Sequence, residues 1–205
     1  PKPIIGMIHI LPLIGTPAYQ NNIDVIIETA LKEADTYLKA GIDALMIENM
    51  HDLPYLNREV GPEIIAMMGI IAHEIKKRST VPCGIQILAG ANQAALAVAA
   101  SAGLAFIRAE GFVFSHIADE GQMDACAGEL LRYRKMIDAQ NILVFTDIKK
   151  KHSAHAITQD VNIAETAQAA AFFRSDGLIL TGASTGKETD LSEIEAVKAA
   201  VDLPV

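Results

Sequence analysis

The chain has 205 residues, a formal net charge of −8 and 51% hydrophobic residues, of which few are aromatic. A chain of this length buries roughly 70% of its unfolded surface, so we expect residues 1–205 to form one domain. The acidic balance argues against nucleic acid as a partner, because its recognition needs a basic face. A local cluster of Lys and Arg still allows a phosphorylated metabolite as a ligand.

No apolar run approaches the roughly 18 residues of a membrane span, and no signal-peptide pattern opens the chain. We therefore expect a cytoplasmic protein without a transmembrane segment. Cys83 and Cys126 match no disulfide or metal-ligand spacing.

Short apolar runs, each a predicted strand, alternate with helix-patterned segments along the chain. The strands are expected at residues 4–8, 44–47, 83–87, 104–107, 142–146 and 178–180. The helices are expected at residues 23–39, 62–78, 92–102, 124–139, 162–174 and 191–200. Strands that alternate with helices imply a parallel sheet built from right-handed βα units.

The spacing of these units fits an eight-unit barrel better than a finished open sheet. Residues 202–205 resemble the approach to a seventh strand. Against a typical barrel of about 250 residues, we expect strands seven and eight to be missing or truncated in this chain. The prediction is a (β/α)8 TIM barrel that is incomplete at the C-terminus.

Polar side chains follow the predicted strands, where ligands of parallel sheets bind. His9 follows the first strand, and Glu48 and Asn49 follow the second. Glu48 is interpreted as a general base, a metal ligand or a salt-bridge partner of Arg108 or Lys149. His9 is interpreted either as a functional group or as a hydrogen-bonded packing residue.

The fifth strand leads into Asp147 and Lys149, two residues apart and hence on one side of the chain. This pair is interpreted as a proton donor beside an anionic substrate, as a Schiff-base lysine, or as a structural ion pair. Lys149 to Lys151 form the most basic segment of the chain, which indicates anion binding or a solvated charge run. Arg108 suits a carboxylate or phosphate through its planar fork, and Glu110 is placed to orient it.

Potential metal ligands near these strand ends lack a diagnostic spacing. They are His51, Asp52, His116 and Asp119. If several carboxylates converge, Mg²⁺ or Mn²⁺ would be preferred over Zn²⁺. We assign no residue as a metal ligand and expect no nucleotide cofactor.

The segment Gly182–Lys187 follows the sixth strand and invites comparison with a nucleotide-binding P-loop. It is one residue short between its glycines, and Glu188 stands where Ser or Thr should follow the Lys, so a P-loop is rejected. A Gly- and hydroxyl-rich turn ahead of a helix still suits phosphate through its backbone amides. The expected contacts are Gly182, Ser184, Thr185 and Gly186.

Several segments together resemble the BtpA family, which includes the SgcQ proteins. They are Lys2 to His9, Met46 to Asn49 with Pro54, Phe106 to Glu110, Asp147 to His152, and Thr181 to Gly186. The resemblance runs from end to end. It implies a barrel of the ribulose-phosphate-binding type and an enzyme of unsettled activity. Some members occur beside sugar-uptake functions, and the name-giving cyanobacterial member is linked to photosystem I accumulation.

These residues favour a TIM-barrel enzyme that acts on a small phosphorylated sugar or similar anion by acid–base chemistry, as an isomerase, epimerase or aldolase. Asp147 and Lys149 would form the central pair, with Glu48 as base and His9 as proton shuttle. Arg108 and Lys150 would hold the anion. Two alternatives stay open: a non-catalytic assembly factor whose rim charges pair with each other, and a nucleosidase-type hydrolase. A homo-oligomer is expected.

Overall fold

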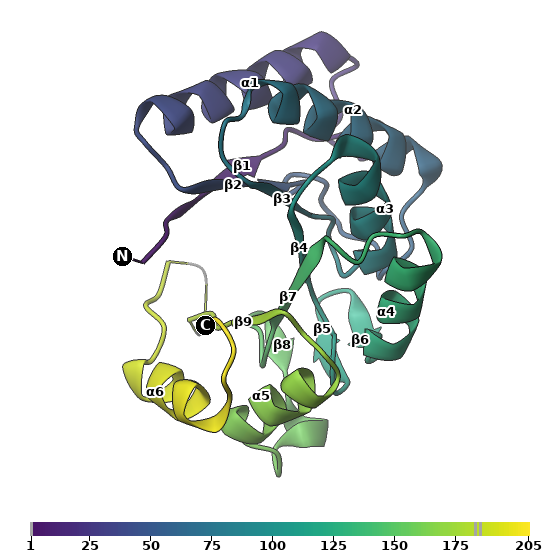
Figure 1. Ribbon diagram of the computed structural model, residues 1–205. Helices are drawn as coiled ribbons and strands as arrows, with labels where there is room; N and C mark the ends of the chain where they lie inside the picture. The colour runs from purple at the N-terminus through teal and green to yellow at the C-terminus, as the bar shows by residue number, and fades with distance from the viewer. Residues whose placement is uncertain (1, 183, 185) are drawn as a thin grey trace.

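Within residues 2–182, 184 and 186–205, which the computed structural model describes, six parallel strands form one curved sheet. The helices lie on its outer, convex face (Figure 1). The sheet runs in the order β1-β2-β3-β4-β7-β9. The strands are β1 (Ile5–His9), β2 (Ala44–Glu48), β3 (Cys83–Gln86), β4 (Phe106–Ala109), β7 (Leu143–Asp147) and β9 (Gly177–Ile179). The predicted alternation of strands and helices is confirmed.

Four helices have the predicted bounds, and two are shorter than predicted. The four are α1 (Ile23–Lys39), α2 (Pro62–Arg78), α3 (Asn92–Ala102) and α6 (Leu191–Ala200). The shorter helices are α4 (Ala127–Met136) and α5 (Ile163–Phe172). Asn162 lies outside α5 because it is the N-cap: its side chain accepts from Glu165 N, and Glu165 reciprocates in a capping box.

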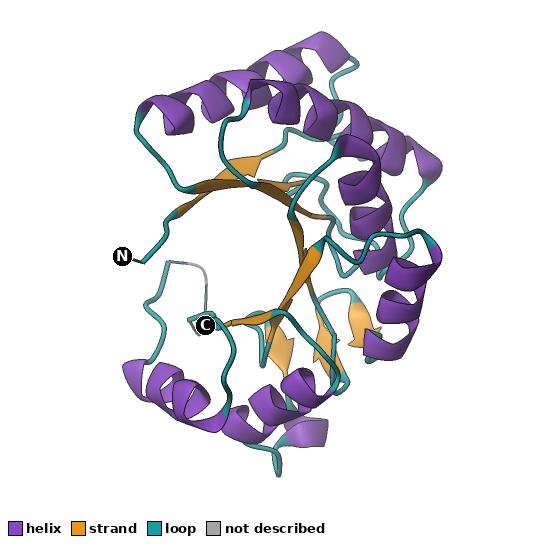
Figure 2. Ribbon diagram, in the orientation of Figure 1, coloured by secondary structure: helices purple, strands orange, loops and turns teal. Residues whose placement is uncertain are grey.

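A second, small antiparallel sheet has no counterpart in the sequence prediction. Its strands are β5 (His116–Ala118), β6 (Gly121–Met123) and β8 (Ser153–Ala154), in the order β6-β5-β8. The first two come from the β4–α4 connection, and the third follows β7, ahead of the turn η1 (Ala156–Thr158). Figure 2 shows these strands apart from the main sheet. They pair segments that are too short to show a hydrophobic period.

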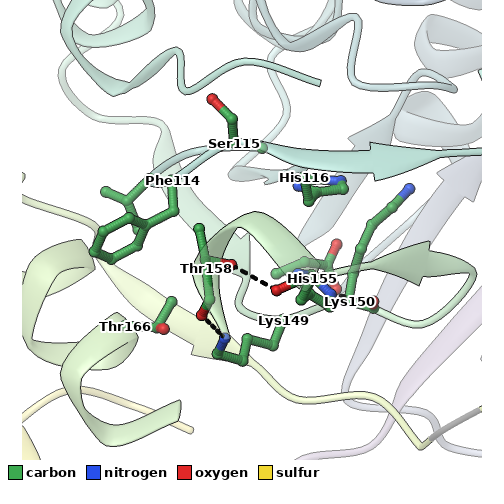
Figure 3. Close-up of a pocket in the computed structure, with 11 residues that line it drawn as sticks. Phe114, Ser115, His116, Lys149, Lys150, His155, Thr158 and Thr166 are labelled. Atoms are coloured by element: carbon green, nitrogen blue, oxygen red, sulfur yellow. Dashed lines mark hydrogen bonds between the residues drawn. The ribbon is translucent and has the colours of Figure 1, made fainter. Parts of the chain in front are cut away.

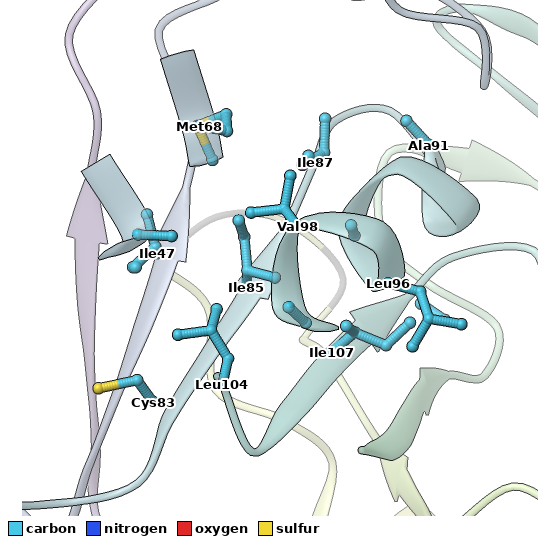
Figure 4. Close-up of a cluster of buried hydrophobic side chains, with 14 of the residues drawn as sticks. Ile47, Met68, Cys83, Ile85, Ile87, Ala91, Leu96, Val98, Leu104 and Ile107 are labelled. Carbon is cyan, nitrogen blue, oxygen red and sulfur yellow. The ribbon is translucent and has the colours of Figure 1, made fainter. Parts of the chain in front are cut away.

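Most of the core lies between the sheet and the helices. Ile85 and Ile107 of neighbouring strands pack with Leu96 and Val98 of α3, and each of the four is at most 3% exposed (Figure 4). A smaller cluster fills the concave side of the sheet: Met46 and Phe106 are buried there, and Phe145 packs against them. A barrel interior packed with side chains is the arrangement expected of this fold.

The last residues of the chain run beside β9. Leu178 N donates to Pro204 O at 2.9 Å. This contact places the segment around Pro204 where the sequence predicts the approach to a seventh strand.

Candidate active site

The carboxyl ends of the parallel strands bring the predicted polar residues to one rim. Register pairs His9 of β1 with Glu48 of β2, and Glu48 with Gln86 of β3. Arg108 lies in β4 and Asp147 ends β7. Because the strands are parallel, their carboxyl ends lie along the same edge of the sheet. Residues from distant parts of the chain therefore meet at this rim.

His9 and Glu48 form the first pair of the rim. The His9 Nε2 atom lies 3.3 Å from Glu48 Oε2, with side-chain exposures of 38% and 11%. The hydrogen bond to Glu48 is the largest cause of a raised pKa at His9, and partial burial opposes it. A histidine with an adjacent carboxylate and access to solvent is suited to proton transfer.

Arg108 and Asp147 form a second, much less exposed pair. The Nε and Nη2 atoms of Arg108 donate to the two carboxylate oxygens of Asp147, each at 2.9 Å. The Asp147 side chain is 1% exposed. Asp147 is thus paired with Arg108. The sequence analysis paired it with Lys149 instead. This bidentate geometry uses two of the five guanidinium donors and leaves the others available.

Glu110 and Lys150 form the third pair. Lys150 Nζ donates to Glu110 Oε2 at 3.0 Å, and Gln86 Nε2 donates to Glu110 Oε1 at 2.9 Å. Burial raises the pKa of Glu110, while Lys150 opposes that shift. Glu110 therefore contacts Lys150 and Gln86, and among the described residues no hydrogen bond joins it to Arg108.

Asn92, the first residue of α3, fixes the backbone of Glu110. Its Nδ2 atom donates to Glu110 O at 2.7 Å, and its Oδ1 atom accepts from Glu110 N at 3.1 Å. Both residues are buried. The sequence analysis assigned no role to Asn92, because an amide at the start of a helix is usually read as a cap.

A cavity of about 410 Å³ opens between these pairs. One wall is apolar, and the turn between β5 and β6 supplies another. The lining residues are Met7, His9, Glu48, Met50, Tyr55, Leu88, Ala89, Arg108, Glu110, Asp119, Glu120, Lys150, Lys151 and His152. The volume and the mixture of apolar and charged walls are those of a small-molecule site.

Lys149 faces a different, smaller cavity. Its backbone is left-handed, with φ of +43°, a conformation that costs free energy for a non-glycine residue. Its Nζ atom donates to Thr158 O at 3.1 Å. His116 and His155, whose ring planes are tilted by 43°, line the same cavity. Figure 3 shows Lys149 and Lys150 leaving the chain in different directions. Lys150 and Lys151 line the larger cavity, and Lys149 does not.

The predicted phosphate turn is described only in part. Ala183 and Thr185 lie outside the described residues. Gly182 is close to the backbone of the same loop: a Cβ there would lie 2.2 Å from Lys187 O, so no other residue fits. Lys187 N donates to Ser184 O at 3.1 Å. Lys151 N, in turn, donates to Thr181 Oγ1 at 3.0 Å, which links the two loops.

The potential metal ligands are not gathered. Among the described residues, no three His, Cys, Asp or Glu side chains are placed to hold a metal ion. Asp52 instead accepts from Leu13 N and from Asn49 Nδ2, at 2.8 and 2.9 Å. Asn49 Oδ1 accepts from Leu88 N at 2.7 Å, so this network joins the loops after β1, β2 and β3.

In the part of the chain described, no helix is long and apolar enough to cross a membrane.

Two proteins illustrate which known sequences this chain is similar to. A mitochondrial uncharacterized protein of Caenorhabditis elegans is 48% identical over 98% of this chain and 75% of its own length. The photosystem I biogenesis protein BtpA of Synechocystis is 31% identical over the whole of this chain and 71% of its own length.

Solved structures with a similar fold are enzymes. The N-acetylmannosamine-6-phosphate 2-epimerase of Clostridium perfringens superposes with a TM-score of 0.56 at 13% identity, over 99% of this chain and 74% of that one. A 2,3-dimethylmalate lyase superposes with a TM-score of 0.52 at 14% identity, over 86% of this chain and 57% of that one. Likeness at this identity shows the fold alone, a TIM barrel. The BtpA family pattern matches residues 1–205, and the chain belongs to the BtpA family.

Proposed function

We propose that this chain carries the active site of an enzyme that moves protons next to a carbonyl group of a small phosphorylated sugar or related anion. Isomerisation, epimerisation and aldol-type cleavage share this step. The observation that carries the proposal is the His9–Glu48 pair, 3.3 Å apart, at the mouth of a cavity of about 410 Å³. Fold likeness to epimerases and lyases is an analogy that agrees with it.

Glu48 is the base in this proposal, and His9 is the proton shuttle. Glu48 takes the proton from the carbon beside the carbonyl. His9, hydrogen-bonded to Glu48 and partly open to solvent, then exchanges that proton with the substrate oxygen or with water. The enolate formed in between is negative, so a fixed positive charge is needed nearby to stabilise it.

Arg108 and Lys150 supply that charge and hold the anionic group. The Nη1 donors of Arg108 do not bond Asp147. Lys150 donates one of its three N–H groups to Glu110. Asp147 and Glu110 are positioning residues for these two cations. The backbone around Gly182, Ser184 and Gly186, with Thr185, remains the proposed phosphate contact. Lys149, which bonds Thr158 O in the smaller cavity, is assigned to holding the loop after β7.

The first test is ligand binding followed by turnover. A thermal-shift screen would present sugar phosphates, nucleosides and divalent metal salts to the chain. A ligand at 100 times its Kd adds about 2.7 kcal/mol of stability. We expect stabilisation by sugar phosphates, and loss of turnover without loss of binding in Glu48→Gln. Stabilisation by nucleosides alone would instead favour a hydrolase.

A second candidate function is a non-catalytic assembly factor. It is favoured by the pairing of rim charges, since Arg108, Lys150 and His9 each have a carboxylate partner. The Synechocystis relative is named a photosystem I biogenesis protein, which agrees with a role of this kind. An assembly factor would bind no substrate in the cavity. If no sugar phosphate of the complete panel stabilises the chain, this result would favour an assembly factor over an enzyme.

A further inference from the structure

Buried carboxylates outnumber cations around the proposed anion site. The carboxylates of Glu48, Glu110 and Asp147 are buried there. The cations of this region are Arg108 and Lys150, whose side chains are 18% and 10% exposed. Arg108 already donates to Asp147, and Lys150 already donates to Glu110. A bound anion therefore adds negative charge at a place where the existing cations are already compensated.

The rest of the cavity lining does not supply the missing positive charge. Lys151 adds one cation, whereas Asp119 and Glu120 add two carboxylates. The two histidines of the lining, His9 and His152, are positive only when they are protonated. Binding of an anion is therefore favoured if a titratable group of the site takes up a proton at the same time.

Glu110 is the carboxylate whose compensation depends on the cation that would bind the anion. Among the described residues, Lys150 is its only ion-pair partner. An anion at Lys150 shares the single positive charge of that ammonium group, so less of this charge compensates Glu110. Because Glu110 is buried, water cannot replace the lost compensation. Burial already raises the pKa of Glu110, which favours a proton as the replacement.

The other charged or titratable groups near Glu110 and Lys150 do not take over this role. Two of them are neutral near pH 7, because burial raises the pKa of Tyr55 to about 12 and lowers that of His116 to about 4. The charged groups each have another partner: Arg108 bonds Asp147, Glu48 bonds His9, and Arg58 bonds the backbone oxygen of Gly111.

Gln86 determines which oxygen of Glu110 can carry the proton. Its Nε2 atom donates to Glu110 Oε1 at 2.9 Å, and Gln86 is buried. A neutral carboxyl group keeps one acceptor oxygen and gains one O–H donor. Glu110 Oε1 therefore accepts from Gln86 in both forms, and the proton belongs on Oε2, the atom that faces Lys150 Nζ at 3.0 Å.

We propose that Glu110 takes up one proton when an anion binds at Lys150, and that its Oε2–H group then donates to the bound anion. The inference rests on the proposed function and adds a residue that contacts the substrate. The proton comes from the solvent and forms a bond with Glu110 Oε2. Lys150 keeps its own proton and charge and turns an N–H group to the anion, in which no bond breaks. Glu110 lines the cavity, so this contact needs no rearrangement of the backbone.

Binding of inorganic sulfate tests the proposal, because sulfate stays a dianion from pH 5.5 to pH 8.5. In calorimetric titration we expect its affinity to fall as the pH rises, by at most about ten-fold per pH unit, which is the limit for uptake of one proton. Infrared difference spectra should gain the carbonyl band of a protonated carboxyl group when sulfate is added. This band is read in the wild type, and its absence would overturn the proposal even if variants of Glu110 fail to fold.

Glu110→Gln imitates the neutral carboxyl group and tests the assignment to this residue. At pH 8.5 we expect this variant to bind sulfate about ten-fold more tightly than the wild type does, without the infrared band. If Glu110 only positioned Lys150, the variant would bind sulfate more weakly. Glu129→Gln, which removes an exposed carboxylate on α4, is the matched control and should keep the wild-type band and affinity. A pH dependence that survives in Glu110→Gln and is lost in His9→Gln would assign the proton to His9 and overturn the proposal.

The outcomes separate this inference from the function on which it rests. Sugar phosphates that bind and turn over, while sulfate produces no carboxyl band, would overturn the inference and leave the enzyme standing. A sulfate-induced band that is lost in Glu110→Gln, together with a sugar-phosphate panel that does not bind, would support proton uptake and count against the proposed function. Absence of sulfate binding at every pH would overturn the inference, since it requires an anion at Lys150.

Discussion

The two sides of the cavity hold their charges differently. On the β1–β2 side, the His9 side chain is 38% exposed and lies 3.3 Å from Glu48. On the β4–β7 side, Asp147 is 1% exposed and accepts two hydrogen bonds of 2.9 Å from Arg108. Water screens the first pair much more than the second. In the proposed mechanism, the exposed pair exchanges protons and the buried pairs hold the geometry of the site.

Breaking the buried arginine pair should have the largest effect. Arg108→Met leaves the Asp147 carboxylate buried without its counter-charge. We expect a loss of roughly 3–5 kcal/mol in the free energy of unfolding, measured by urea denaturation at neutral pH. The combined change Arg108→Met with Asp147→Leu is the control, because replacing both partners by apolar groups leaves no uncompensated charge. If the double variant is as unstable as the single one, packing and not charge explains the loss.

The two neighbouring lysines offer a matched comparison. Lys150→Met removes the cation from Glu110, but Gln86 still donates to that carboxyl group, so we expect a smaller loss of roughly 2–3 kcal/mol. Lys149→Met removes a bond to one carbonyl oxygen and should cost about 1 kcal/mol. The same urea measurement compares both. Ligand binding should fall in Lys150→Met only. Equal loss of binding in Lys149→Met would return Lys149 to the central role that its place in the sequence suggested.

Variants of Asn92 test whether the hydrogen bonds that hold the Glu110 backbone contribute to stability. Asn92→Ala removes both hydrogen bonds to the Glu110 peptide and should cost about 2 kcal/mol in thermal or urea unfolding. Asn92→Asp keeps the acceptor of Glu110 N but places a buried carboxylate oxygen against the carbonyl oxygen of Glu110, so a larger loss than in Asn92→Ala is expected. A variant with wild-type stability would show that Glu110 is held by its side-chain partners alone.

The sequence predicted the parallel architecture well, because hydrophobic period and strand-end chemistry are local signals. It correctly placed the carboxyl ends of β1, β2, β4 and β7 at one rim. It did not predict β5, β6 and β8, which depend on pairing between Ile117 and Ala154, 37 positions apart by their numbering. Short strands of this kind have no period of their own, so only the folded chain shows them.

Of the residues predicted for the site, His9, Glu48, Arg108 and Lys150 line the larger cavity, whereas Asp147 and Lys149 line the smaller one. Spacing alone placed Asp147 and Lys149 on one side of the chain, which holds for an extended strand. The left-handed backbone at Lys149 ends that regularity and turns its side chain into the smaller cavity. Tyr55, Asn92 and Glu120 were missed as members because each lies in a connection or at a helix start, where polar residues are common for other reasons.

The exposed pair should produce the smallest effect on stability and a distinct dependence on pH. Because the pKa of His9 is raised in the folded chain, its contribution to stability is complete below the ordinary value of about 6.5 and is lost as the pH rises through the folded value. Solvent screening limits this contribution to about 1 kcal/mol or less. The stability difference between the wild type and His9→Gln should therefore be larger at pH 5.5 than at pH 8.5.

His73→Gln provides the control, since it removes an exposed histidine on α2 that is not part of the His9–Glu48 pair. NMR titration of the imidazole signals gives a direct readout: Glu48→Gln should lower the pKa of His9, because it removes the largest cause of the shift. An unchanged His9 titration in Glu48→Gln would mean that the two side chains do not share a proton in solution. The proposed proton transfer would then not take place at the His9–Glu48 pair. The Lys150–Glu110 pair, which also lines the cavity, would be the next candidate.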